Sequence, residues 1–307
     1  MKRVVITGPT GAIGISIINR MIEKGIEVLA ICNPTSLRIN RIPHSPLVKI
    51  VKCDLNDFSK LEVSDGNEWD VFYHLAWQGT FGNTRDDVYV QNQNIKNAVD
   101  AVELAKRLGC HTFIGAGSQA EYGRVNGMLT PETPAMPESG YGIAKLCAGM
   151  MTRLKCEQMG MKHIWIRVLS VYGPYDGMNT MVMSLIKKLI LNESPETTKG
   201  EQLWDYLYSD DAGRAFYLTG LYGRSNAVYC LGSGQVRPLK EYICDIQSVV
   251  NPDVDIRIGS VMYSPKQVMF LGADISSLKE DTGFQPVVDF KEGVLKTAEW
   301  IKGEMEL

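Results

Sequence analysis

The sequence predicts an α/β fold with a doubly wound parallel sheet and a smaller mixed α/β lobe after it. Two features of the first half support this prediction. Short apolar runs recur there, at 2–7, 26–32, 48–53, 69–76, 111–116 and 163–168. Helical patterns separate several of these runs. Strands that are buried on both faces are continuously hydrophobic, and their alternation with helices indicates a parallel sheet.

Apolar spacing and stop signals predict the helices. The first helix, 12–24, has Ile13, Ile17 and Met21 on one side. Longer helices are expected at 86–108, which Gly109 would end, and at 141–159.

The pattern changes after Tyr172. Helices are expected near 178–191, 237–250 and 289–303, with short strands near 228–231 and 254–258. We therefore expect a first domain over 1–172 and a smaller lobe, which would bind substrate, over 173–307.

A glycine-rich turn joins the first strand to the first helix, with the sequence Thr-Gly-Pro-Thr-Gly-Ala-Ile-Gly over 7–14. Glycines at this spacing allow a tight turn, close approach of the backbone to a pyrophosphate, and close helix–strand packing. The helix N-terminus offers free N–H groups to the anion. Its position predicts a Rossmann-type dinucleotide site, although turns also use glycine for steric reasons alone. The site residues expected here are Gly8, Thr10, Gly11, Ala12, Ile13 and Gly14.

The end of the second strand selects the cofactor. An acidic residue there binds the ribose 2′-hydroxyl of NAD, but this chain has none between 31 and 38. Asn33, Ser36 and Arg38 lie in this loop, and Ser36 and Arg38 could hold a 2′-phosphate. We therefore favour NADP over NAD; the alternative is that Arg38 is a solvated surface residue.

Asp54 and Leu55 follow the third strand, where they would border the adenine. Asp54 could instead cap the segment that follows it.

Tyr141 and Lys145 are four residues apart and share a helix face. A nearby cation lowers the pKa of a tyrosine, which suits proton transfer to or from a hydroxyl or keto oxygen. The spacing alone is common in helices. Here it follows Ser118, which ends a parallel strand at the edge where open α/β sheets bind ligands.

Together these motifs resemble the extended short-chain dehydrogenases/reductases of the NAD(P)-dependent epimerase/dehydratase group, many of which act on nucleotide sugars. The resemblance implies that Ser118 donates a hydrogen bond, that Tyr141 is the acid/base, and that Lys145 tunes Tyr141 and binds the nicotinamide ribose. It also implies a homodimer formed by the helices near 86–108 and 141–159. The other matching segments are His74-Leu75-Ala76, in which Leu75 and Ala76 would border the cofactor, the loop 118–123, Arg167 with Tyr172-Gly173-Pro174, and 200–212.

The chain departs from the family pattern at three places, one of which bears on the type of reaction. Family 4,6-dehydratases carry an Asp-Glu pair after the catalytic hydroxyl residue, where this chain has Gln119 and Ala120. Dehydration is therefore not expected. Trp204 replaces an arginine that commonly contacts the nucleotide diphosphate, and Ser170 replaces the usual asparagine.

The substrate contacts expected from the sequence come from several loops and one helix. Glu121 could bind substrate, act as a second acid/base group, or be only a capping carboxylate. Asn92 is the candidate for the family's active-site asparagine, with Asn94 and Asn97 as alternatives. Arg237 or Lys240 could contact phosphate or lie solvated on the surface. The full set of expected substrate contacts is Gln78, Asn92, Gln119, Glu121, Ser170 and Arg237.

Three functions stay open. We favour an NADPH-dependent reductase of a 4-keto sugar nucleotide, because the acid after the second strand and the Asp-Glu pair are both missing. An epimerase that works through a transient keto intermediate would use the same groups and is the alternative. A dinucleotide-sensing protein without chemistry is a third possibility, weakened by the presence of both Tyr141 and Lys145.

Composition argues against other classes of partner. The formal net charge of −3 gives no electrostatic reason to expect nucleic acid or an anionic membrane. No stretch approaches the roughly 18 apolar residues of a membrane span. Seven scattered cysteines predict reduced thiols and a cytoplasmic setting. Four histidines show no ligand spacing with them, so no metal site is expected.

Overall fold

A seven-stranded parallel sheet forms the centre of the computed structural model, which describes residues 1–63 and 68–306. The strand order is β11-β6-β5-β4-β1-β2-β3, and every neighbouring pair is parallel. The predicted fold class is therefore confirmed. The strands are β1 (Arg3–Thr7), β2 (Glu27–Cys32), β3 (Val48–Lys52), β4 (Val71–His74), β5 (Thr112–Ser118), β6 (Lys162–Val168) and β11 (Ala227–Leu231).

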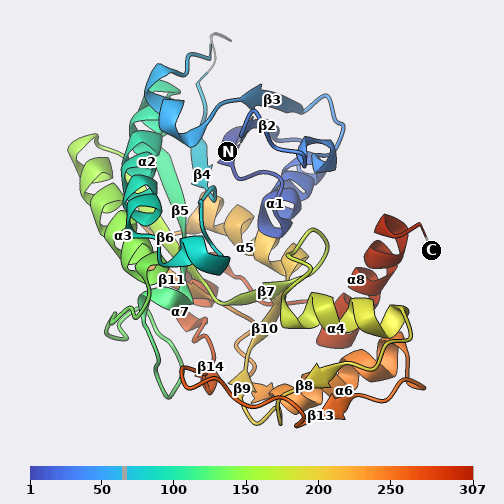
Figure 1. Cartoon of the computed structure of the whole chain (residues 1–307). Helices are drawn as coiled ribbons and strands as arrows, with labels where there is room; N and C mark the ends of the chain where they lie inside the picture. Colours follow the sequence, from blue (N-terminus) through green and yellow to red (C-terminus); the bar gives the residue numbers. More distant parts are fainter. Residues whose placement is uncertain (64–67, 307) are drawn as a thin grey trace.

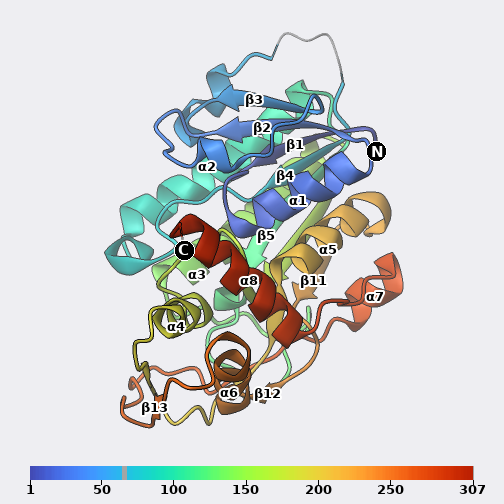
Figure 2. The same cartoon turned by 90° about the vertical axis from the view of Figure 1, so that its right-hand side faces the viewer.

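Helices cover both faces of this sheet (Figures 1 and 2). On one face α1 (Ala12–Glu23) packs against α5 (Ser209–Tyr222), and on the other α2 (Val88–Arg107) packs against α3 (Gly140–Gln158). Each layer closes over its own buried apolar cluster. This arrangement follows from strands whose side chains are apolar on both faces.

The smaller lobe lies below the sheet in Figure 1 and is built mainly from three helices. These are α4 (Met181–Ile190), α6 (Leu239–Val250) and α8 (Phe290–Glu304), which bury a shared apolar cluster. Short strands form three small sheets around them: β7 (Ser170–Tyr172) with β10 (Tyr206–Tyr208), β9 (Leu203–Trp204) with β12 (Arg237–Pro238) and β14 (Phe270–Leu271), and β8 (Glu196–Thr197) with β13 (Arg257–Ile258).

The chain returns to the central sheet after residue 172. β11, expected as a short strand of the smaller lobe, pairs with β6 at the sheet edge, and α5 packs on α1. α7 (Ser276–Thr282) then packs against β11 and α5. Residues beyond 172 thus build both lobes, because β6 has an edge that only a later strand can fill.

In the part of the chain that the structure describes, four short 3-10 helices lie in the connections. They are η1 (Ile39–Arg41), η2 (Leu55–Lys60), η3 (Gly82–Arg85) and η4 (Gln119–Glu121). η2 lines part of the site described below, and η3 and η4 lie next to residues that line it.

Candidate active site

The glycine-rich turn between β1 and α1 is held by close backbone contacts. Gly8 has φ of +70°, and a Cβ added there would lie 2.8 Å from the backbone nitrogen of Ala76. A Cβ added to Gly14 would lie 2.3 Å from the carbonyl oxygen of Gly8. By contrast, a Cβ on Gly11 would have no neighbour closer than 4.0 Å. Gly8 and Gly14 therefore close the turn, and Gly11 faces open space in front of the helix N-terminus.

Two cavities lie on either side of this turn and share Gly8, Gly11, Leu75 and Trp77 in their walls. The first, of about 290 Å³, runs toward the ends of β2 and β3. Its walls contain the predicted residues Gly8, Thr10, Gly11, Asn33, Ser36, Leu55, Leu75, Ala76 and Gln78. The second, of about 320 Å³, runs toward the ends of β5 and β7. Its walls contain the predicted residues Gly8, Gly11, Ala12, Ile13, Gly14, Leu75, Ser118, Tyr141 and Lys145.

Two predicted cofactor residues lie outside these walls. Arg38 is exposed on the surface. Asp54 caps η2, where its side chain accepts from the backbone N–H of Asn56, and its Oδ2 accepts a hydrogen bond of 2.9 Å from Asn33 Nδ2. The loop after β2 therefore presents an amide backed by a carboxylate at the first cavity.

The predicted Ser118, Tyr141 and Lys145 meet at the second cavity. Ser118 ends β5, and its Oγ accepts a hydrogen bond from the backbone N–H of Ala120. Tyr141 and Lys145 lie in the first turns of α3, which Ser139 caps. The strand end and the helix start thus bring a hydroxyl, a phenol and an amine to one wall.

The amine of Lys145 lies nearer to the ring of Trp77 than to the phenol ring of Tyr141. Its Nζ donates to the carbonyl oxygen of Ala116 at 2.7 Å and lies 3.8 Å from the ring centroid of Trp77, against 5.8 Å for Tyr141. Burial lowers the pKa of Lys145 to about 7.

The pKa of Tyr141 is raised above its ordinary value by burial, although a hydrogen bond with Ser118 and the charge of Arg85 act in the opposite sense. Lys145 is not among the groups that lower this pKa, so its effect on Tyr141 stays a prediction. Desolvation of the phenolate outweighs the favourable contacts.

Glu121 lies behind Ser118 and is completely buried. Its carboxylate accepts hydrogen bonds from Ser118 N (2.8 Å), Trp165 Nε1 (3.0 Å) and Arg167 Nε (2.7 Å). These three donors occupy it, and it lies outside the lining of the second cavity. The capping alternative describes this carboxylate better than substrate binding does.

The other expected substrate residues are dispersed. Asn92 is exposed on α2, whereas both alternatives, Asn94 and Asn97, are buried. Asn94 holds the backbone of Gln78 at both N–H and C=O. Gln119 is half-buried in η4, outside the lining of the second cavity. Ser170 accepts a hydrogen bond of 2.8 Å from Trp204 Nε1.

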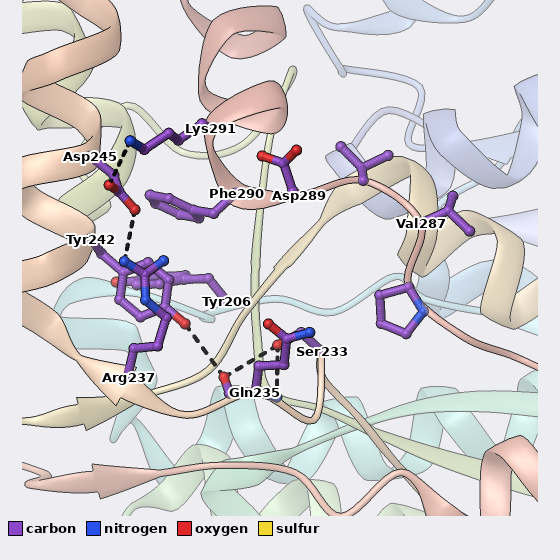
Figure 3. Close-up of a pocket in the computed structure, with 12 residues that line it drawn as sticks. Tyr206, Ser233, Gln235, Arg237, Tyr242, Asp245, Val287, Asp289, Phe290 and Lys291 are labelled. Atoms are coloured by element: carbon purple, nitrogen blue, oxygen red, sulfur yellow. Dashed lines mark hydrogen bonds and ion pairs between the residues drawn. The ribbon is translucent and has the colours of Figure 1, made fainter.

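Arg237 lies in a separate cavity of about 380 Å³ in the smaller lobe (Figure 3). Its guanidinium pairs with Glu241 at 3.0 Å and Asp245 at 2.8 Å, and lies over the ring of Tyr242. The structure therefore does not bring Arg237 together with Ser118 and Tyr141, and acidic side chains already satisfy its charge.

The wall of the second cavity also contains residues that the sequence analysis missed, among them Thr80, Phe81 and Asp176. Thr80 and Phe81 come from the loop after β4, and Asp176 from the loop before α4. Asp176 lies two residues after the matched motif Tyr172-Gly173-Pro174, so its position offered a signal. Thr80 and Phe81 belong to no motif.

The residues that the structure describes contain no cluster of three or more His, Cys, Asp or Glu side chains placed to hold a metal ion. None of their helices has the length and apolar character that crossing a bilayer requires.

Comparison with known proteins gives the site its context. The model of the NAD dependent epimerase/dehydratase family matches residues 4–232. UDP-glucose 4-epimerase of Mycolicibacterium smegmatis is 24% identical over 99% of this chain and 100% of its own length. dTDP-4-dehydro-6-deoxyglucose reductase of Escherichia coli is 25% identical over 97% of both chains.

The fold recurs in a solved structure. UDP-N-acetylglucosamine 4-epimerase from Methanobrevibacter ruminantium, in complex with UDP-N-acetylmuramic acid, superimposes with a TM-score of 0.88 at 24% identity and covers 99% of both chains. The match of the family model confirms the resemblance expected from the motifs. The chain belongs to the NAD dependent epimerase/dehydratase family of enzymes.

Proposed function

We propose that the protein is an NAD-dependent 4-epimerase of a nucleotide-linked hexose, working through a transient keto sugar. The observation that carries this proposal is that Ser118, Tyr141 and Lys145 share one cavity with the glycine-rich turn. The similarity to a UDP-glucose 4-epimerase over the full length of both chains supports it. The expected preference for a reductase gives way to the epimerase.

The glycine-rich turn suits a dinucleotide. Gly8 and Gly14 leave no room for side chains, and the space in front of Gly11 adjoins both cavities. Backbone N–H groups at the start of α1 would hold the pyrophosphate, and Asn33 and Leu55 would border the adenosine. The chemistry that NAD supplies when bound is reversible removal of a hydride from a carbon that bears a hydroxyl group.

The chain's own residues would handle the proton. Tyr141 takes the proton of the sugar hydroxyl as the keto group forms and gives it back when the hydroxyl is restored. Ser118 donates a hydrogen bond to the same oxygen, and the buried Lys145 orients the nicotinamide ribose. Because the hydride that leaves the sugar carbon is returned to it, the reaction needs no net oxidant.

NAD is proposed in place of NADP. The earlier preference for NADP depended on Ser36 and Arg38, but Arg38 is exposed and lies outside the lining of the first cavity. Asn33, which does line it, is hydrogen-bonded to the carboxylate of Asp54. A negative charge this close to the ribose would repel a 2′-phosphate.

A 4-keto nucleotide-sugar reductase is the second candidate, favoured by the similarity to the E. coli reductase over 97% of both chains. The same three side chains would serve it. The two reactions differ in cofactor balance, because a reductase consumes one reduced cofactor for each sugar and an epimerase consumes none.

The test is to incubate the NAD-loaded protein with UDP-glucose and with UDP-N-acetylglucosamine and to follow the sugars by proton NMR. We expect the 4-epimer to accumulate to an equilibrium without change in reduced cofactor. Tyr141→Phe should slow conversion by about 10²–10⁴-fold. Stoichiometric oxidation of NADPH by a dTDP-4-keto-6-deoxy sugar, with no epimerisation of either UDP-sugar, would replace the epimerase by the reductase.

We also propose that the protein forms a homodimer through α2 and α3. Ile143, Met150, Met151 and Leu154 of α3 have relative exposures of 46–57% in the single chain. Large apolar side chains that share one helix surface in this way are typical of an interface. Sedimentation analysis tests the proposal.

A further inference from the structure

Arg85, at the end of η3, makes a direct contact with the candidate acid/base residue. Its guanidinium carbon lies 4.3 Å from the centroid of the Tyr141 ring. Its Nη1 donates to the carbonyl oxygen of Thr80 at 2.7 Å, and Thr80 lines the second cavity. Arg85 therefore joins the cavity wall to the face of the phenol ring.

The segment that carries Arg85 is fixed against the start of α3. Asp86 Oδ1 accepts a hydrogen bond of 2.7 Å from the backbone N–H of Gly140, the residue before Tyr141. A Cβ added to Gly140 would lie 3.2 Å from Cα of Asp86 and 3.4 Å from the carbonyl oxygen of Arg85. The two segments are thus in backbone contact beside the phenol, and this contact sets where the guanidinium can lie.

Lys145 does not make an equally close contact with the phenol ring. Its Nζ is engaged by Ala116 and lies nearer to Trp77 than to Tyr141. With a pKa of about 7, Lys145 also carries only part of its charge at neutral pH. An arginine is charged at every pH at which the protein is folded.

We propose that Arg85 is a positioning residue for Tyr141, in which the guanidinium holds the phenol ring against the cavity and supplies the permanent positive charge that favours the tyrosinate. The proposal rests on the proposed function only in taking Tyr141 as the acid/base. It extends the catalytic set by a residue from the loop after β4.

Several charged groups surround the phenol. Arg85 from η3 acts to lower the pKa of Tyr141, as does the hydrogen bond with Ser118, whereas burial and the Glu121 carboxylate raise it. Lys145 lies on the same helix, Asp86 lies at its start, and Asp176 lines the same cavity. Among these groups, all of them described residues, Arg85 alone combines contact with the ring and a charge that does not titrate.

The experiment measures the phenol directly. A fluorotyrosine is incorporated at position 141, and its ionisation is followed by fluorine NMR against pH, with and without NAD. An opposite charge at this range shifts a pKa by about 1–3 units, and because the guanidinium lies over the ring we expect a rise of about one unit in Arg85→Met. Arg85→Lys, which keeps a charge, should recover part of that shift.

The matched control is Arg124→Met. Arg124 is exposed and pairs at 2.7 Å with Glu138, which lies just before α3 in the chain. Among the described residues, the cation over the phenol ring at close range is Arg85 and not Arg124. Arg124→Met should leave the pKa of the phenol unchanged. If the role of Arg85 were purely structural, Arg85→Met would lower the thermal stability without changing the pKa of the phenol.

Either outcome is informative whether or not the protein is an epimerase. If the pKa in Arg85→Met stays within about 0.2 units of the parent, or if Arg85→Lys and Arg85→Met shift it equally, the proposal is wrong. If the pKa rises but neither UDP-sugar is converted by the parent protein, the inference about Arg85 stands and the proposed reaction fails. In an active enzyme the acidic limb of the kcat/KM profile should move upward by the same amount.

Discussion

Two alanine substitutions in the glycine-rich turn should have opposite effects, although both replace a glycine of the same motif. In Gly14→Ala the new methyl carbon would lie 2.3 Å from the Gly8 carbonyl oxygen and 2.9 Å from Cα of Pro9. Both neighbours are backbone atoms, so no side chain can rotate away. In Gly11→Ala the nearest atom would be 4.0 Å away, which is an ordinary contact.

The expected magnitudes follow from these distances. Overpacking of this kind costs about 1–3 kcal/mol, and the better helix propensity of alanine returns at most about 1 kcal/mol. We therefore expect Gly14→Ala to lower the free energy of unfolding by about 2 kcal/mol. Gly11 is the N-cap of α1 with φ of −87° and ψ of 166°, a conformation open to alanine. The free energy of unfolding of the Gly11→Ala protein should therefore change by less than about 1 kcal/mol.

For NAD binding the order should reverse, with Gly11→Ala the variant that loses affinity. The methyl group of Gly11→Ala enters the space shared by both cavities, where the pyrophosphate would approach the backbone. A tenfold or greater rise in Kd, equivalent to about 1.4 kcal/mol, is expected. Urea denaturation and calorimetric titration with NAD on the cofactor-free proteins measure both quantities. An unchanged Kd in Gly11→Ala, or a Gly14→Ala protein as stable as the parent, would refute the steric reasoning.

Three further predictions use other parts of the chain. Glu121→Ala should lower the free energy of unfolding by about 3–5 kcal/mol, because the buried guanidinium of Arg167 loses its carboxylate, and adding Arg167→Met should recover much of that loss in urea denaturation. Arg38→Ala should leave the Kd for NAD within about twofold, since Arg38 is exposed; a tenfold loss of NADPH binding would restore the earlier preference for NADP. Met150→Glu should convert the proposed dimer to monomer in sedimentation analysis, whereas an unchanged mass would remove α3 from the interface.

The features that the sequence predicts well are local. Continuous apolar runs predict β1, β2, β4, β5 and β6 because burial on both faces demands them, whereas β3 at the sheet edge is half-buried or exposed along its length. The turn and the Tyr141–Lys145 spacing depend only on nearby residues. β11 was expected as a strand but not as part of the central sheet. Its five residues do not reveal that the free edge of β6 is their partner, since pairing depends on where the chain returns.

Spacing in the sequence does not predict the contact partners of long side chains. The four-residue spacing places Tyr141 and Lys145 on one helix face, but a lysine has enough reach to find the Ala116 carbonyl and the Trp77 ring in preference to the phenol. The cation over the phenol comes from Arg85, far away in the chain. Glu121 likewise finds its donors on β6, which no local pattern encodes.

Two of the departures from the family pattern involve residues that contact each other. Trp204 and Ser170, which replace an arginine and an asparagine, are joined by a hydrogen bond of 2.8 Å. A half-buried indole needs a partner for its N–H, and the short serine provides one. Arg237 pairs in register with Trp204 across β9 and β12, but its charge is taken up by two acids on α6. Arginine at 204 alone would remove the indole N–H and with it the hydrogen bond to Ser170.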